Sequence, residues 1–155
     1  MYIDLDLHFS DGVSEAFLTN VSSSPSVLTL SVHHAAPGFF PASPLGELTR
    51  LDNSHPFTLS LPLLQGASNA TFARIWRSCI EPVRQTFQPD YVVLQCGVDG
   101  LAGDPHAVWN WGIDVSAEGS MGWCLQQAMT WGPKLLLLGG GAHLPLVFPG
   151  SAICE

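Results

Sequence analysis

The chain has 155 residues, a length that predicts one domain or part of one. Five Lys and Arg residues against 13 Asp and Glu give a formal net charge of -8, which argues against direct binding to nucleic acid because little could neutralise the phosphates. Only 12% of the residues are charged and 46% are hydrophobic, so we expect a sizeable core and a surface that is partly covered in the functional state.

Cysteine usage and hydropathy suggest an intracellular, reducing compartment. The four cysteines form no CxxC pair or zinc-finger spacing, and Cys96 lies in an apolar run that predicts a buried thiol. We find no secretory signal and no apolar run of the ~20 residues that a membrane span needs, so no membrane association is expected. The acidic balance would suit a basic partner, such as a lysine-rich tail.

The first predicted strand, residues 2–8, carries Asp4, Asp6 and His8 at alternate positions. Side chains two apart on a strand share one face, and burying two carboxylates and an imidazole together without a partner would be costly. A bound cation would relieve that cost, and Asp and His are ordinary zinc ligands. The alternative is a strand end with a solvated cap and a core histidine.

A short helix follows over 13–18 with Asp11 as its cap, and a second strand, apolar on both faces, over 27–33. The loop 35–44 contains Phe39 and Phe40 among prolines and a glycine. These two rings either form a binding surface or lid, or fold back onto the core.

The remaining elements alternate between strand and helix. We predict an edge strand over 57–61, a helix over 69–88 kinked by Pro82, a strand over 91–96 and a helix over 116–130. A buried fifth strand over 134–138 ends in Gly139, Gly140 and Gly141. This alternation predicts a parallel α/β sheet with helices on both faces, whose functional sites lie beyond the carboxyl ends of its strands.

Three features fall at that edge: the Asp-Asp-His set, Asp99 and the triple glycine. Asp6, His8 and Asp99 would form an Asp-His-Asp zinc site with a fourth position left open, as in catalytic zinc sites. Asp4 is a candidate acceptor behind the ligands. Backbone carbonyls near the Ser31 hydroxyl could hold a monovalent cation. The triple glycine either lets the backbone approach a substrate or is a loose turn.

Six blocks of residues also occur together in one known family. They are YIDLDLH (2–8), DGV (11–13), SVH (31–33), PGFFP (37–41), VVLQCGVDGLAGDP (92–105) and LGGG (138–141). The chain resembles the carboxyl-terminal part of the catalytic domain of zinc-dependent histone deacetylases, class I type. The run 109–111 suggests a fungal branch. The resemblance covers residues 1 to about 141, with 142–155 as a divergent tail.

The resemblance implies the arginase/deacetylase α/β fold and a hydrolase that removes acetyl groups from lysines of histone tails or other proteins. Zn²⁺ would polarise the acetyl carbonyl and bind the attacking water, while two histidines move protons and a tyrosine donates to the oxyanion. Nuclear localisation, with a cytoplasmic pool, chromatin regulation and a corepressor complex are also implied.

The resemblance further implies roles for individual residues. Asp6, His8 and Asp99 match zinc ligands, and Asp4 and Asp11 match carboxylates that orient the paired histidines. The remaining matches are a K⁺ site (Asp4, Asp6, His8, Ser31, Val32), the acyl-lysine channel (Phe39, Phe40, His106, Gly140, Gly141) and the tyrosine position (His143).

Several departures lead us to expect a chain that is weak or inactive alone. The paired histidines belong to a segment before Asp4, Phe9-Ser10 replaces His-Gly, and His143 stands in place of tyrosine. We interpret 142–155 as a shifted reading frame or an alternative exon. Loss of the amino-terminal half should uncover apolar surface and an unpaired edge, and should leave strand 2–8 without its neighbours.

Two alternative functions stay open beside the truncated deacetylase. One is a non-catalytic metal-binding fragment or pseudoenzyme that serves as an interaction module. The other is an arginase-type hydrolase, which would need two metal ions and more carboxylates near His8; the adjacent phenylalanines argue against it.

Overall fold

The computed structural model describes residues 1–18, 27–48, 55–106 and 108–139. Its centre is a five-stranded sheet in the order β3-β2-β1-β4-β5, in which every adjacent pair of strands is parallel. The strands are β1 (Tyr2–Asp4), β2 (Thr29–His34), β3 (Thr58–Leu63), β4 (Tyr91–Gln95) and β5 (Lys134–Leu138). The predicted parallel α/β architecture is confirmed, and so is the edge position of the third strand.

β1 is the central strand of the sheet, with β2 on one side and β4 on the other. Tyr2 pairs with Thr29 of β2 and with Val93 of β4. The expectation that this strand lacks neighbours is therefore wrong. It is also shorter than predicted, since the ladder ends at Asp4 and residues 5–8 follow a bent path.

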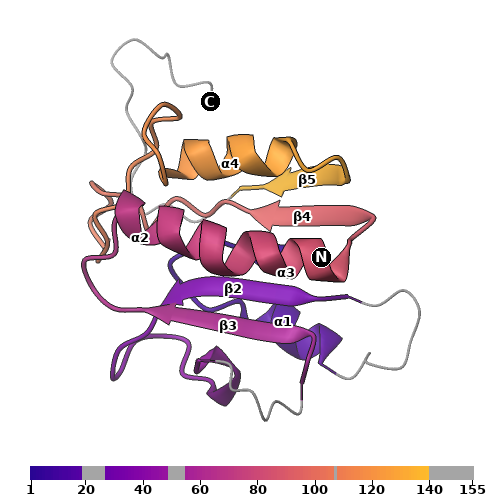
Figure 1. Cartoon of the computed structure of the whole chain (residues 1–155). Helices are drawn as coiled ribbons and strands as arrows, with labels where there is room; N and C mark the ends of the chain where they lie inside the picture. The colour runs from indigo at the N-terminus through magenta and orange to yellow at the C-terminus, as the bar shows by residue number, and fades with distance from the viewer. Residues whose placement is uncertain (19–26, 49–54, 107, 140–155) are drawn as a thin grey trace, which may run out of the picture.

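Helices cover both faces of the sheet, as predicted. Figure 1 shows α2 (Asn69–Ile75) and α3 (Glu81–Phe87) in front of the strands and α1 (Asp11–Phe17) behind them. α4 (Met121–Met129) lies on the α2–α3 side, where Trp76 contacts Trp123 with ring centroids 6.2 Å apart. A short 3-10 turn, η2 (Pro44–Gly46), follows the loop after β2.

Pro82 interrupts the long helix as predicted. Between α2 and α3 the chain forms a π-helical segment, η3 (Trp76–Ile80), and the Glu81 N–H donates to the Trp76 carbonyl, five residues back. Pro82 has no N–H and its ring crowds the carbonyl four residues before it, so one widened turn accommodates it. The helix predicted over 116–130 is shorter, because Ser120 caps it by accepting from the Trp123 N–H.

The core joins the sheet to the segment between β4 and α4. Trp111 is fully buried and stacks on Phe72 with ring centroids 3.8 Å apart, and its indole N–H donates to the Gly119 carbonyl at 2.8 Å. Trp109 is also buried against Phe72. These tryptophans hold down the long connection that leaves β4.

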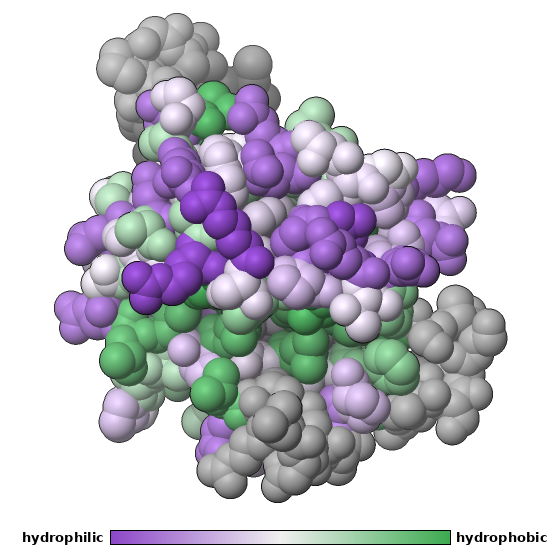
Figure 2. Space-filling model, viewed as in Figure 1, coloured by the Kyte–Doolittle hydropathy of each residue, from purple (hydrophilic) through white to green (hydrophobic). Residues whose placement is uncertain are grey.

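The fifth strand is placed correctly by the sequence but is not buried. Among the described strands β5 lies at one edge of the sheet, and Leu136 is 55% exposed, with Leu137 and Leu138 also exposed. Apolar side chains also gather on the face beneath the α2–α3 helices, over β3 (Figure 2). There Phe57, Leu59, Val83 and Phe87 line a groove of about 410 Å³. No helix among the described residues is long and apolar enough to cross a membrane.

Candidate metal centre

Asp6, His8 and Asp99 converge beyond the carboxyl ends of β1 and β4. One ligand atom from each lies within 4.8 Å of the others. His8 Nδ1 is 2.8 Å from Asp99 Oδ2 and 3.4 Å from Asp6 Oδ1. The same imidazole nitrogen thus faces both carboxylates. This donor set fits a divalent metal with Asp and His ligands, and zinc sites of this kind keep a fourth position open.

The local backbone brings Asp6 and His8 together by turns rather than by strand alternation. Asp4 Oδ1 accepts the Asp6 N–H at 2.9 Å, and Asp6 Oδ1 accepts the His8 N–H at 2.8 Å. Aspartates commonly accept an N–H two residues on, which bends the chain. The predicted shared face on an extended strand is therefore wrong, although the predicted cluster forms.

Asp99 reaches the cluster from the loop after β4. It is 2% exposed, and its Oδ1 accepts the Leu7 N–H at 3.2 Å while Oδ2 faces His8. Gly97 makes this approach possible, because a Cβ on that glycine would overlap with the Asp6 carboxylate. Gly100 is equally confined, since a Cβ there would lie 2.7 Å from the Trp109 ring. Both glycines are visible in the sequence, but the sequence does not indicate that Gly97 lies against Asp6 or that Gly100 lies against Trp109.

Asp4 is buried directly behind the ligands. Its Oδ2 accepts the Tyr2 hydroxyl at 2.5 Å, and burial raises the pKa of its carboxyl to about 6. Burial also raises the pKa of Asp6. The carboxylates are thus poorly solvated without a cation, which is the situation that metal binding relieves.

Ser31 lies beside Asp4 in the sheet register, on β2. Its Oγ is 3.0 Å from His33 Nδ1, and His33 Nε2 donates to the Gly46 carbonyl at 2.9 Å. Burial lowers the pKa of His33, so the neutral ring accepts the Ser31 proton, and the serine oxygen in turn accepts the Ser10 N–H at 3.5 Å. Val32 is fully buried, and Phe9 packs against His33 with ring centroids 4.8 Å apart. That Phe9 stands in place of a family histidine stays a prediction.

The two phenylalanines of the loop after β2 have different environments. Phe39 stacks against His8, with ring centroids 5.1 Å apart, whereas Phe40 is 73% exposed. Phe39 thus packs against the core, whereas a binding or lid role for the exposed Phe40 stays a prediction. His106 is exposed and its backbone N–H donates to Asp104 at 2.9 Å. The channel roles of Phe39, Phe40 and His106 stay predictions.

Other predicted residues are placed differently or lie outside the described part. Asp11 is the first residue of α1 rather than its cap, and its Oδ1 accepts the Gly12 N–H at 2.7 Å. Gly140, Gly141 and His143 lie outside the described residues. Cys96 is half-buried rather than fully buried, and burial raises the pKa of its thiol to about 11.

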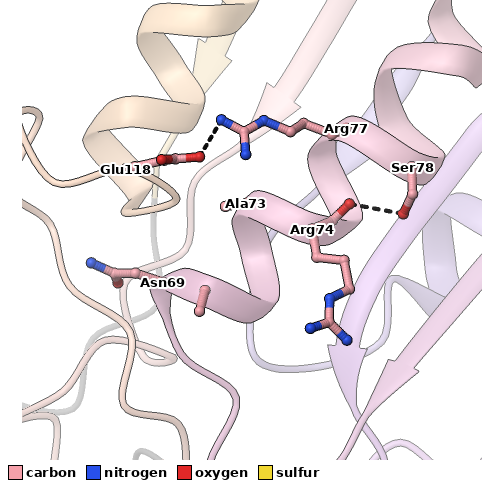
Figure 3. Close-up of a pocket in the computed structure, with 7 residues that line it drawn as sticks. Asn69, Ala73, Arg74, Arg77, Ser78 and Glu118 are labelled. Atoms are coloured by element: carbon pink, nitrogen blue, oxygen red, sulfur yellow. Dashed lines mark hydrogen bonds and ion pairs between the residues drawn. The ribbon is translucent and has the colours of Figure 1, made fainter.

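A second cavity lies on the outer face of α2, away from these ligands (Figure 3). It has a volume of about 740 Å³ and none of the three metal-site residues lines it. Arg77 pairs with Glu118 across it, while Arg74 points away from that pair (Figure 3). Glu118 thus neutralises one of the two arginine charges that line this cavity.

A parallel α/β sheet with an Asp-His-Asp set at its carboxyl edge defines an α/β protein with a candidate three-ligand metal site. Comparison with known proteins narrows this class. The model of the histone deacetylase domain matches residues 1–148. Among curated relatives, histone deacetylase 8 of Xenopus laevis is 38% identical over 146 residues, which cover 94% of this chain and 42% of the relative.

Relatives from a fish and a plant are also histone deacetylases. Histone deacetylase 8 of Danio rerio and histone deacetylase 6 of Arabidopsis thaliana are each 34% identical over 143 residues, 92% of this chain and 35% and 28% of the relatives. The chain therefore belongs to the histone deacetylase domain family, and it spans less than half the length of these relatives. The fungal branch and the boundary at residue 141 stay predictions.

Proposed function

We propose that this chain carries the metal-binding part of a zinc-dependent protein-lysine deacetylase site. The observation that carries the proposal is the convergence of Asp6, His8 and Asp99 from two separate segments of the chain. A carboxylate-imidazole-carboxylate set with an open position suits a metal that must also bind water and substrate. Family membership supplies the reaction class.

The chain's own residues would act by holding and orienting. Asp6, His8 and Asp99 would hold zinc, and the Leu7 N–H fixes the Asp99 carboxylate at 3.2 Å. When bound, zinc would polarise the acetyl carbonyl and lower the pKa of a water molecule. Asp4 keeps Asp6 in place by accepting its N–H. Burial of Asp99 keeps competing water from its side of the cluster.

A monovalent cation, K⁺, is proposed behind the zinc site. Asp4 and Ser31 are paired across β1 and β2, and both are buried. Gln95, paired with Asp4 on the other side, has a buried side-chain oxygen without a hydrogen-bond partner among the described residues. Oxygen donors from neighbouring strands are what a hard cation prefers. The backbone carbonyl of Val32 completes the proposed set.

The proposed substrate is an acetylated lysine of a histone tail or another basic protein. The net charge of -8 supports a basic partner, because opposite charges steer association. A corepressor complex, a role in chromatin regulation and a nuclear or cytoplasmic location stay predictions that the family resemblance implies.

The deacetylase proposal is tested with a short acetyl-lysine peptide and the zinc-loaded chain, beside Asp99→Asn. We expect slow hydrolysis that depends on zinc and disappears in the variant, because the amide cannot replace the carboxylate ligand. Stoichiometric zinc binding without any hydrolysis would instead favour the non-catalytic metal-binding module.

A further inference from the structure

Two histidine rings contact the Phe39 ring beside the candidate metal centre, and we refer to His8, Phe39 and His34 as the ring stack. The rings of His8 and Phe39 are nearly parallel, with centroids 5.1 Å apart and an interplanar angle of 15°. Phe39 also meets His34 at a steep angle, with ring centroids 4.6 Å apart and an interplanar angle of 77°. The stack thus joins a candidate metal ligand to the end of β2.

The far end of the ring stack is fixed to the sheet. His34 is buried, and its Nδ1 donates to the Leu63 carbonyl at 3.0 Å, since a carbonyl can only accept. Its backbone N–H donates to the Leu7 carbonyl at 2.8 Å. Because Leu7 adjoins His8 in the chain, His34 is tied to the metal-binding segment through both the backbone and the rings.

The near end would be loose without Phe39. The His8 side chain is 33% exposed, and Nδ1 makes its contacts with both carboxylates, those of Asp6 and Asp99. One edge contact leaves an imidazole free to tilt about its Cβ–Cγ bond. A flat ring packed on its face restricts that tilt, and such aromatic contacts stabilise beyond the area that they bury.

We propose that Phe39 is a positioning residue for the metal centre, with His34 as its support. Its ring sets the plane of His8 so that Nδ1 faces Asp6 and Asp99 before a metal arrives. Preorganisation of this kind raises affinity because less freedom is lost on binding. The inference rests on the proposed metal site and adds to it a residue that contacts a ligand without ligating.

The probe is Co²⁺, because its visible absorption reports the geometry of its ligands. The affinity of the full chain for Co²⁺ is measured by competition with a chelator. Phe39→Leu keeps an apolar side chain but removes the flat face, and we expect it to weaken Co²⁺ binding by about 3- to 10-fold and to alter the absorption band. Phe39→Tyr keeps the flat ring and should restore both readouts.

The matched control is Phe57→Leu. Phe57 is also half-buried and also contacts an aromatic ring, that of Phe87 at 6.0 Å, but it lies just before β3, at the opposite end of that strand from Leu63. Co²⁺ affinity should be unchanged in this control, even where thermal unfolding shows that stability falls. A merely structural role of Phe39 would make the two variants behave alike.

Each outcome decides the proposal. Unchanged Co²⁺ affinity and spectrum in Phe39→Leu would overturn it while leaving the metal site intact, whereas a wild-type chain without Co²⁺ affinity would overturn the metal site and the inference together. Where Phe39→Leu does not fold, His34→Asn removes the supporting ring but retains a donor for Leu63. We expect it to weaken Co²⁺ binding by about 2- to 3-fold, and unchanged affinity would equally overturn the proposal.

Discussion

Gly97 lies directly against Asp6, with no room for a side chain between them. The candidate metal centre therefore depends on a residue that contributes no ligand atom. The two backbones approach because β4 delivers the loop containing Asp99 beside the end of β1. At the scale of single residues, the site is determined as much by this absence of a Cβ as by its three donors.

Gly97→Ala should weaken zinc binding. The added Cβ would push the Asp6 carboxylate away from His8, and we expect zinc affinity to fall by about 10- to 100-fold, as when other supporting residues of metal ligands are changed. The measurement is zinc affinity by chelator competition. The matched control is Gly12→Ala, where a Cβ meets nothing within 4 Å. This change should stabilise helix α1 by up to about 1 kcal/mol, because alanine favours a helix more than glycine does. Equal affinities in the two variants would contradict this account.

The sequence predicted which candidate ligands gather but not how they meet. Spacing marked Asp6, His8 and Asp99 as ligand types at strand ends, and those three do converge. The turns that Asp4 and Asp6 form with backbone N–H groups were not predictable from alternation, because short polar side chains compete with the strand ladder for those groups. The contact of Phe39 with His8 depends on a loop conformation that no local pattern encodes.

The connection from β4 to α4 is the element on which Asp99 depends. It contains little regular structure, and Trp109 and Trp111 pack it against Phe72 on α2. The sequence run 109–111 showed two tryptophans in a loop but not that both are core residues, because loop aromatics give no periodic signal. Helix α2, in contrast, was predictable from its apolar repeat.

Trp111→Ala should destabilise the protein by about 3–5 kcal/mol, because a fully buried indole stacked on Phe72 would leave a cavity. The free energy of unfolding is measured by urea titration of the metal-free chain. Met129→Ala, at an exposed position on α4, is the control and should change it by less than about 0.5 kcal/mol. A loss below about 1 kcal/mol in Trp111→Ala would show that the connection is not held by this ring.

At the scale of the whole molecule, the described part of the sheet ends in two edge strands, β3 and β5. β5 pairs only with β4 among the described strands, and three consecutive leucines on it are exposed. Low charge content predicted covered surface, and a parallel sheet normally has both faces buried. The sequence could not identify β5 as an edge strand, because an apolar run has the same sequence pattern whether it pairs with one strand or with two.

Leu136→Lys should reduce self-association of the chain. Exposed apolar edge strands pair with other chains, and a lysine on the edge opposes this. Sedimentation velocity over a range of concentrations should show assembly of the wild type and a larger monomer fraction in the variant. Leu64→Lys, at another exposed leucine outside the strands, should behave as the wild type does. A wild-type chain that stays monomeric at high concentration would count against an adhesive edge.

The most direct test of the account is the zinc content of the purified chain, measured beside Asp6→Ala, Asp99→Ala and the control Asp11→Ala. Asp11 bears a carboxylate outside the cluster, where it accepts the Gly12 N–H. We predict one zinc per chain in the wild type and in Asp11→Ala, and loss of that zinc in the other two variants. A folded wild-type chain without zinc, or zinc retained in both ligand variants, would contradict the metal centre.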